Sequence, residues 1–303
     1  MEAVFINIFD KMKNLIKIED LNKEEILEIL KLAKKIKDNP ENFQDKLKGK
    51  SLATLFFQPS TRTRISSSLA MQKLGGNVTD IYEVKFEVGM GKSESFEDTI
   101  KVIGDYVNLI CLRHNLEEIP FIAENNTDAK IINCGNGKDQ HPTQALLDLF
   151  TIWEEFGRLD NLKIAIVGGL KNSRSAHSLI IALSFFENNN IKLISPPNCK
   201  ILEKYLNLSE NFEETSDFEI SDEDVVYMCG LIAYDTEEEV RKKYQFSQEI
   251  STKLKKSAII LSPLPRIDEI GREVDKLSNA RYFEQSKNGV FVRMAIFIKM
   301  LWD

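Results

Sequence analysis

The sequence predicts an α/β protein with two doubly wound parallel-sheet domains joined by long helices. Short apolar runs alternate with amphipathic segments along most of the 303 residues. This alternation is expected where parallel strands are connected by crossover helices that cover both faces of a sheet. The chain also exceeds the length at which one hydrophobic core usually stops growing, which favours two domains of about 150 residues each.

The first element in the chain is a helix predicted over residues 23–38. Asn22 followed by Glu25 is a capping-box pattern, and apolar residues then recur at helical spacing on one face. Seven apolar runs typical of buried strands follow, at residues 51–57, 108–114, 130–135, 163–169, 190–196, 224–229 and 258–265. Helix-like segments lie between these runs, at residues 62–75, 95–107, 141–157, 176–188 and 237–245.

A domain boundary is predicted near residue 150, because the amphipathic segment 141–157 is long enough to bridge two domains. The first domain would then comprise residues 1–150 and the second residues 151–287. Residues 288–303 form a final helix that is too apolar to be left in water. We therefore expect this helix to pack back against the first domain.

Composition and charge exclude several classes of protein. No stretch approaches the roughly 18 apolar residues that span a bilayer, and the N-terminal residues lack the features of a secretory signal. We therefore expect a cytoplasmic protein without a membrane partner. A net charge of -7 disfavours a nucleic-acid partner, so any anionic ligand must be bound by a local cluster of positive charge. The cysteines show no CxxC spacing, which predicts neither a disulfide framework nor a metal site: Cys111, Cys134, Cys199 and Cys229.

Polar residues follow the apolar run 51–57, at the point where a strand would end and a helix begin. The run from Gln58 to Arg64 offers hydroxyl groups, guanidinium groups and the open N–H groups of a helix start. Ligands of open α/β sheets bind beyond the carboxyl ends of strands, and helix N-termini and arginines both bind phosphate. From these residues alone, a phosphate site and an ordinary helix cap with solvated arginines are equally good interpretations.

Two further apolar runs are followed by candidate ligand-binding residues. Arg113 and His114 end the run 108–114, and His141 begins the helix-like segment 141–157. A lone histidine is more often structural than catalytic, so His141 alone carries little weight. The segment GGLKNSR lacks GxGxxG, and the sequence has no GxxxxGK[ST], which disfavours dinucleotide and Walker-type nucleotide binding.

The segment FFQPSTRTR, residues 56–64, resembles the carbamoyl-phosphate motif of the aspartate/ornithine carbamoyltransferase family. Residues 91–99, GKSESFEDT, resemble the mobile lysine loop of that family, and further segments match in the same order up to SPLPRIDEI and YFEQSKNGVFVRMAIF. The match covers nearly the whole chain, and the segment that begins GNGKDQHPTQ resembles the aspartate branch more than the ornithine branch. The resemblance implies a homotrimer that transfers the carbamoyl group of carbamoyl phosphate to L-aspartate in pyrimidine biosynthesis. It implies no metal and no organic cofactor.

The resemblance also implies a role for each matching residue. The phosphate would be bound by Ser60, Thr61, Arg62 and Thr63, and the carbamoyl group would be oriented by Arg113, His141 and Gln144. Attack of an amine on the carbamoyl carbon places negative charge on the carbonyl oxygen, which hydrogen-bond donors at these positions would stabilise without a covalent nucleophile. The segment that matches the family's HPLPR motif would add two substrate-binding residues, Pro263 and Leu264.

Two residues would bind the second substrate. Arg174 corresponds to an arginine that binds the α-carboxylate of aspartate, whereas His177, one helical turn later, is expected to be structural. Lys92 would enter the active site from a neighbouring subunit; taken alone, it would be an ordinary solvated loop lysine. A separate regulatory chain is left open as a further partner.

Four departures from the family pattern fall on the acceptor side. Gln58 is an uncharged amide where the family has an acidic residue that ties the two domains together. Gly230 and Ile232 stand where the aspartate branch has an arginine and a glutamine, Ser262 replaces a histidine, and Val88 replaces a serine. Losing a charge-assisted contact to a substrate carboxylate typically costs several kcal/mol. Another basic residue would have to replace it: Lys171, Arg241, Lys242 or Arg266.

These departures leave three functions open. The first is a working carbamoyltransferase for aspartate. The second is a carbamoyltransferase for a different amine, with ornithine disfavoured because LSPLPR lacks the HCLP pattern of that branch. The third is a catalytically weak binding or regulatory subunit that retains the anion site and assembles with an active partner.

Overall fold

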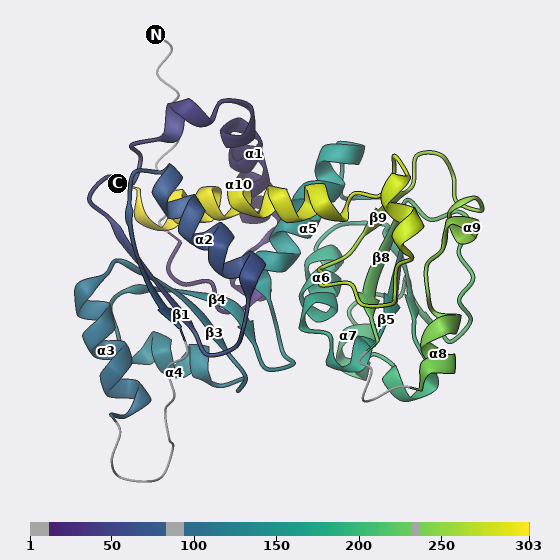
Figure 1. The fold of residues 1–303 in the computed structure, drawn as a ribbon, viewed down its shortest axis with the longest axis horizontal. Helices are drawn as coiled ribbons and strands as arrows, with labels where there is room; N and C mark the ends of the chain where they lie inside the picture. Colours follow the sequence, from purple (N-terminus) through teal and green to yellow (C-terminus); the bar gives the residue numbers. More distant parts are fainter. Residues whose placement is uncertain (1–11, 83–93, 232–236, 303) are drawn as a thin grey trace.

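Two parallel sheets lie side by side in the computed structural model, which describes residues 12–82, 94–231 and 237–302 (Figure 1). The first sheet has the strand order β2-β1-β3-β4, and its neighbouring strands are parallel throughout. Its strands are β1 (Ser51–Phe56), β2 (Asn77–Tyr82), β3 (Leu109–His114) and β4 (Lys130–Asn136). The connecting helices are α2 (Thr61–Lys73), α3 (Phe96–Tyr106) and α4 (Ile119–Asn125).

The second sheet has the order β7-β6-β5-β8-β9 and is also parallel. Its strands are β5 (Lys163–Gly168), β6 (Asn190–Ile194), β7 (Phe212–Thr215), β8 (Val225–Gly230) and β9 (Ile259–Leu261). Its helices are α6 (Arg174–Ser184), α7 (Glu203–Leu206), α8 (Glu238–Lys243) and α9 (Gln248–Ser251). The predicted fold class, with two doubly wound parallel sheets, is therefore confirmed.

Each of the seven apolar runs contains a strand, but two further strands were not predicted. Both β2 and β7 lie at the edge of their sheet and carry polar residues, so their sequences lack the apolar character of a central strand. The run 258–265 forms only the three-residue strand β9. The reason is that Pro263 and Pro265 have no N–H group to donate to a ladder.

The predicted first helix is confirmed as α1 (Lys23–Asp38). The Asn22 side chain accepts from the Glu25 main-chain N–H at 2.9 Å, and the Glu25 carboxylate accepts from the Asn22 N–H at 2.8 Å. This reciprocal pair satisfies two N–H groups that a helix start leaves open. Five buried apolar residues form the inner face of α1, and the helix packs against the C-terminal helix of the chain.

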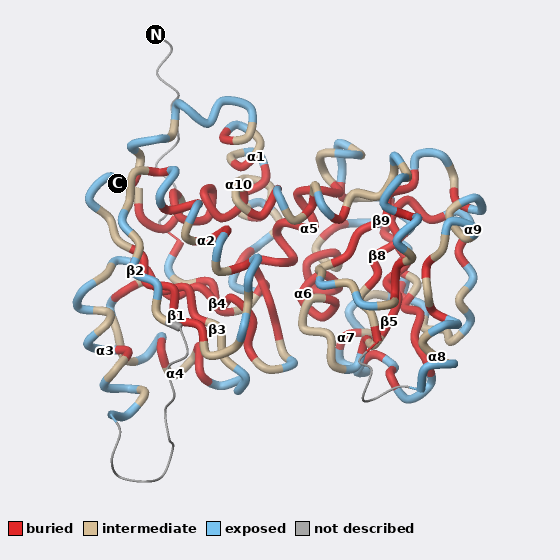
Figure 2. The backbone as a smooth tube through the Cα atoms, in the orientation of Figure 1, coloured by how far each residue is buried: buried red, intermediate tan, exposed pale blue. Residues whose placement is uncertain are grey.

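Two long helices link the halves of the molecule, α5 (Pro142–Phe156) and α10 (Tyr282–Leu301). Helix α10 starts beside β9, packs against α1, α2 and α5, and is buried along most of its length (Figures 1 and 2). The domain boundary predicted near residue 150 falls inside α5 and stays a prediction. Short 3-10 turns complete the described structure: η1 (Ile18–Asp20), η2 (Pro40–Phe43), η3 (Leu170–Asn172), η4 (Pro197–Cys199) and η5 (Arg272–Lys276).

The described residues contain neither a long apolar helix of membrane-spanning length nor a cluster of metal-binding side chains. Among them, no helix combines the length and apolar character that a membrane span requires. No group of three or more histidine, cysteine or acidic side chains in this part of the chain is arranged to hold a metal ion. The four cysteines are free thiols.

Candidate functional site

The strand order of each sheet reverses at one point, between β1 and β3 in the first sheet and between β5 and β8 in the second. Ligands of open α/β sheets bind at such switch points, beyond the carboxyl ends of the strands. The polar residues singled out in the sequence follow these strands. Residues 58–64 follow β1, Arg113 is the last but one residue of β3, Arg174 follows β5, and Gly230 ends β8.

The start of α2 offers open hydrogen-bond donors. Ser60 is the N-cap residue, but its side chain makes no capping hydrogen bond to the helix. The first N–H groups of a helix have no partner within the helix and carry partial positive charge, so they bind anions. Thr61 and Arg62 are exposed in this first turn, whereas Thr63 is buried. The structure thus brings the four residues predicted to bind phosphate to one helix start.

The guanidinium group of Arg113 is half-buried, and few hydrogen bonds offset the cost of burying its charge. Its Nη1 donates to the main-chain oxygen of Cys134 at 3.2 Å, and its buried Nε has no partner within the described residues. Burial lowers the pKa of Arg113 to about 10, and the nearby Arg62 adds to this effect. A buried donor without a partner costs free energy unless a ligand satisfies it. Arg113 is therefore suited to bind a polar or anionic ligand.

His141 is the buried N-cap residue of α5. Its main-chain N–H donates to Ser178 Oγ of α6 at 2.8 Å, which joins the start of α5 to the second half of the molecule. Burial and the positive charges of four nearby arginines lower the pKa of His141 well below its ordinary value. At neutral pH the imidazole is therefore uncharged and can donate one N–H to a carbonyl oxygen.

Arg174 reaches the same place from the second sheet. This residue begins α6, and its Nη1 donates to Gly137 O at 3.0 Å and to Gln58 Oε1 at 3.2 Å. Burial, and then the charge of Arg113, lowers its pKa to about 9. Gln58 was expected to weaken the tie between the two halves. In the structure its neutral amide accepts a hydrogen bond from Arg174 across that junction.

A fourth arginine at the site was missed by the sequence analysis. Arg293 of α10 is buried; its Nη1 donates to Gly289 O at 3.0 Å, its Nη2 donates to Thr143 Oγ1 at 3.2 Å, and its Nε has no partner within the described residues. Burial lowers its pKa. A single arginine inside an otherwise apolar helix segment was the signal that could have identified it.

Three of the four arginines, Arg113, Arg174 and Arg293, are held by neutral groups. The main-chain oxygens of Cys134, Gly137 and Gly289 each accept from one guanidinium, and Gln58 and Thr143 add neutral side-chain oxygens. Within the described residues no ion pair joins Arg62, Arg113, Arg174 or Arg293 to a carboxylate. Within the part of the chain that the structure describes, their positive charge is therefore not neutralised by an ion pair, although the protein as a whole is acidic.

A small cavity of about 20 Å³ opens beside this arginine cluster. Its lining combines residues from α2, α5, α10 and the segment after β9: Arg62, Thr63, Ser66, Gln144, Leu147, Ser262, Pro263, Gln285, Ser286 and Arg293. The predicted residues Gln144 and Pro263 are among them. Leu264, which was also predicted, is half-buried, packs against the apolar core of the second sheet and is not part of this lining.

Three residues singled out in the sequence lie outside the described residues: Lys92, Val88 and Ile232. His177, which was expected to be structural, is buried, with its ring nitrogens beside the main-chain oxygens of Leu170 and Asp139. His114 lies at the end of β3 with its ring against Phe57.

Gly135 lets two of the arginines approach each other, and its replacement by alanine is expected to disturb both. Gly135 has φ of +109°, and a Cβ atom there would lie 3.0 Å from Arg174 Cζ and 3.2 Å from Arg113 Nη1. We expect Gly135→Ala to cost about 1 kcal/mol or more of stability. Displaced guanidinium groups should also weaken the binding of inorganic phosphate, measured by titration calorimetry, by about tenfold or more.

Gly49→Ala is the matched control for this prediction. Gly49 has φ of +83°, but a Cβ atom there would meet no atom within 4 Å. It should lose a similar amount of thermal stability and keep its affinity for the anion. Equal affinities of the two variants would show that Gly135 serves only the backbone.

Comparisons with known proteins identify relatives over nearly the full chain. Residues 13–154 match the family model described as aspartate/ornithine carbamoyltransferase, carbamoyl-P binding domain, and residues 160–300 match its Asp/Orn binding domain. The chain is 44% identical to the aspartate carbamoyltransferase catalytic subunit of Methanococcus vannielii, covering 94% of this chain and 97% of that one. It is 43% identical to the Methanocaldococcus jannaschii catalytic subunit, covering 96% and 99%.

Solved structures show the same fold. The catalytic subunit of M. jannaschii aspartate transcarbamoylase superposes with a TM-score of 0.88 at 42% identity, covering 95% of this chain and 98% of that one. The Trypanosoma cruzi aspartate transcarbamoylase in complex with carbamoyl aspartate and phosphate superposes with a TM-score of 0.87 at 29% identity, covering 97% and 100%.

Proposed function

The chain belongs to the aspartate/ornithine carbamoyltransferase family, and we propose that it transfers the carbamoyl group of carbamoyl phosphate to L-aspartate. The products are N-carbamoyl-L-aspartate and phosphate, and the reaction serves pyrimidine biosynthesis. The observation that carries this proposal is the cluster of four arginines that form no ion pair with a carboxylate among the described residues, at the carboxyl ends of the strands where both sheets reverse their order. Relatives named aspartate carbamoyltransferase catalytic subunit, and a related structure that holds carbamoyl aspartate and phosphate, support it.

Each part of the site takes one part of the substrate. The phosphate binds to the open N–H groups and hydroxyls at the start of α2 and to Arg62. The carbamoyl oxygen accepts hydrogen bonds from Arg113 and from neutral His141. The amine of aspartate attacks the carbamoyl carbon, a C–N bond forms, the C–O bond to phosphate breaks, and the departing phosphate takes up the proton that the nitrogen loses. Negative charge that grows on the carbamoyl oxygen is stabilised by these preorganised donors.

Each of the two substrates binds mainly to one of the two sheet domains. Residues 1–150, together with the helix over 288–303, bind carbamoyl phosphate, and residues 151–287 bind the amino acid. Arg174 takes the α-carboxylate of aspartate. The active unit is a homotrimer in which Lys92 enters the site of a neighbouring subunit, and the word subunit in the names of the relatives supports an assembly. A regulatory chain as a further partner and the expected cytoplasmic location belong to the same proposal.

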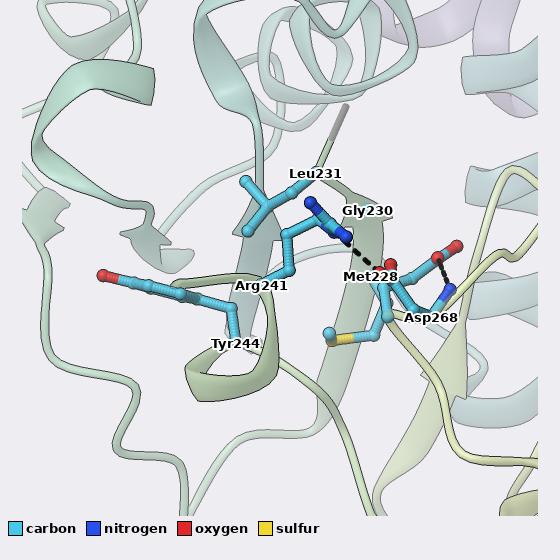
Figure 3. Close-up of a pocket in the computed structure, with 8 residues that line it drawn as sticks. Met228, Gly230, Leu231, Arg241, Tyr244 and Asp268 are labelled. Atoms are coloured by element: carbon cyan, nitrogen blue, oxygen red, sulfur yellow. Dashed lines mark hydrogen bonds and ion pairs between the residues drawn. The ribbon is translucent and has the colours of Figure 1, made fainter. Parts of the chain in front are cut away.

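The second carboxylate of aspartate needs a basic partner, since Gly230 replaces the family arginine. Of the four replacements considered, Arg266 pairs with Asp275, Lys242 is exposed and pairs with Glu238, and Lys171 is exposed. Arg241 also pairs with a carboxylate, that of Asp268, but it differs from the other three because it lines a narrow pocket at the end of β8 together with Gly230. Its side chain extends along the cavity wall, where its Nε donates to Asp268 Oδ2 at 2.7 Å (Figure 3).

Arg241→Gln is expected to raise KM for aspartate by about tenfold or more, because a charge-assisted contact to a carboxylate is lost. The affinity for carbamoyl phosphate, measured by calorimetry, should stay within about twofold, since additivity holds for separate sites. Lys242→Gln on the same helix removes the same charge from an exposed position and serves as the control. An unchanged KM for aspartate in Arg241→Gln would assign the second carboxylate to another residue.

One observation favours a different amine as a second candidate acceptor. A Cβ atom at Gly230 would lie 3.1 Å from Glu269 Cδ, so a buried carboxylate stands behind the position of the missing arginine. With Asp268 on the same cavity wall, this corner is acidic. An acceptor without a second carboxylate would suit it better than aspartate on electrostatic grounds.

Carbamoyl transfer by the purified protein decides between these acceptors. Aspartate is titrated over a wide concentration range, with ornithine, putrescine and other amines assayed beside it. Saturable turnover of aspartate supports the proposed function. If the protein carbamoylates another amine but not aspartate, that amine is the acceptor. If it carbamoylates none of the amines, the protein is a binding or regulatory subunit.

A further inference from the structure

A buried carboxylate lies directly beside the carbamoyl-phosphate side of the site. Asp148 of α5 is fully buried and accepts hydrogen bonds from three side chains on three elements. Gln144 Nε2 of α5 donates at 2.7 Å, Gln285 Nε2 of α10 donates at 2.6 Å, and the Tyr227 hydroxyl of β8 donates at 2.8 Å. The carboxylate therefore connects the two long helices with the second sheet.

The chemistry of a carboxylate dictates how the two amides are oriented. An ionised carboxylate accepts hydrogen bonds and has none to donate, so each glutamine must turn its NH₂ group toward Asp148. The amide oxygens then point the other way. Gln285 Oε1 accepts from the Ser262 main-chain N–H at 2.9 Å. Within the described residues, the Gln144 oxygen accepts no hydrogen bond, and Gln144 lines the cavity beside Arg62.

The orientation of Gln144 matters because the charged groups at this cavity, Arg62 and Arg293, are hydrogen-bond donors only. The guanidinium groups cannot accept a hydrogen bond. The carbamoyl group has an oxygen that accepts and an amino group that donates. Arginine can satisfy the oxygen, but the amino group needs an acceptor, and an outward-facing amide oxygen of Gln144 supplies one.

We propose that Asp148 is a positioning residue that makes Gln144 an acceptor for the amino group of carbamoyl phosphate. Through Gln285, the same carboxylate also holds the Ser262–Pro263 segment at the cavity wall. Asp148 does not contact the substrate itself. Its effect is selection of a carbamoyl group over an acyl group of similar shape that has a methyl group in place of the amino group. This inference rests on the proposed function, because it assumes that carbamoyl phosphate is the donor substrate.

The protonation of Asp148 adds a pH dependence to this selection. Burial raises the pKa of Asp148 to about 7, while its three hydrogen bonds and the charge of Arg293 oppose that rise. The other titratable groups that face it are Tyr227 and Cys229 of β8, and burial raises the pKa of both far from neutrality. When the proton is on Oδ1, the oxygen that faces both glutamines, Asp148 must donate a hydrogen bond there, so one glutamine has to turn its amide oxygen inward. Selection should therefore be present above pH 7 and decline as the pH falls through that value.

The test compares carbamoyl phosphate with acetyl phosphate as donor substrates for the full-length wild type, Asp148→Asn and Glu154→Gln. Glu154 is the matched control, because it also lies on α5 and accepts from a side chain of α10, Asn288 Nδ2, at 3.0 Å. We expect Asp148→Asn to reduce the ratio of kcat/KM values for the two donors by about tenfold or more, since an amide can also donate and leaves Gln144 free to turn. Glu154→Gln should keep the wild-type ratio.

The wild type provides a second measurement that does not depend on the folding of a variant. Its preference for carbamoyl phosphate over acetyl phosphate should fall as the pH is lowered from 8 to 6, and Asp148→Asn should show no such change. A wild-type preference that is constant over this range, or an Asp148→Asn variant that keeps the full preference, would overturn the inference.

A binding experiment distinguishes an error in the proposed function from an error in the role of Asp148. If the wild type carbamoylates no amine, calorimetric binding of carbamoyl phosphate and acetyl phosphate replaces turnover. Selective binding that Asp148→Asn abolishes supports the role of Asp148 even then, and binding of the two donors with equal affinity by the wild type rejects it.

Discussion

Replacing Arg62 with alanine is expected to weaken carbamoyl-phosphate binding by roughly a hundredfold or more, because a charge-assisted contact to phosphate is worth several kcal/mol. Arg62 lies in the first turn of α2 and lines the cavity together with Thr63. The substitution leaves the N–H groups of the helix start in place. Residual binding therefore reports what the helix terminus contributes without the guanidinium. Titration calorimetry of the purified variant measures both the loss of affinity and the binding that remains.

Lys73→Ala is the matched control for this prediction. Lys73 is exposed in the last turn of the same helix, so its removal changes the net charge equally, far from the cavity. Its effect on affinity should be within about threefold and should disappear at high salt, where distant charges are screened. Near-normal affinity in Arg62→Ala would contradict the assignment of the start of α2 as the phosphate site.

The fold could be predicted from the sequence wherever burial and local chemistry agree. Central strands are buried on both faces and read as apolar runs, and the capping pair of Asn22 and Glu25 marks a helix start. The edge strands β2 and β7 are exposed on one side and contain polar residues, so their pairing depends on neighbours that are distant in sequence. That dependence cannot be read from a local pattern.

The residues of the candidate site also fall into two groups, those that could be selected from the sequence and those that could not. The start of α2, Arg113 and His141 follow strands or begin helices, so position along the chain was enough to select them. Asp148 and Arg293 act through contacts with other elements, and both lie in the middle of apolar helices where a sequence pattern indicates core. The bond between Gln58 and Arg174 likewise requires knowledge of how the two sheets meet.

Substitution of Arg113 by methionine is expected to lower kcat by about a hundredfold to a thousandfold, the usual cost of removing one donor to a developing oxyanion. The reason is geometric. Arg113 lies near the end of strand β3, just before His114, with one N–H bonded to Cys134 O and with a buried Nε that has no partner within the described residues. A preorganised donor that is unsatisfied in the free protein gains most when negative charge forms on the carbamoyl oxygen.

The same substitution should not destabilise the unliganded protein. Burial lowers the pKa of Arg113 to about 10, which means that the folded protein disfavours this charge. Methionine of similar volume removes that cost, so we expect the free energy of unfolding, measured by urea denaturation, to be unchanged or higher. Lower activity together with equal or greater stability is the behaviour of a residue kept for function.

A control and a kinetic distinction complete the test of Arg113. Arg158 is exposed, and its Nε also donates to a main-chain oxygen, that of Asp160 at 3.1 Å, so Arg158→Met should leave kcat unchanged. Arg62 is expected to act on substrate binding, whereas Arg113 is expected to act on the transition state. If Arg113→Met raised KM and left kcat intact, Arg113 would be a ground-state binding residue. Stabilisation of the carbamoyl oxygen would then fall to His141, whose uncharged ring has one N–H to give.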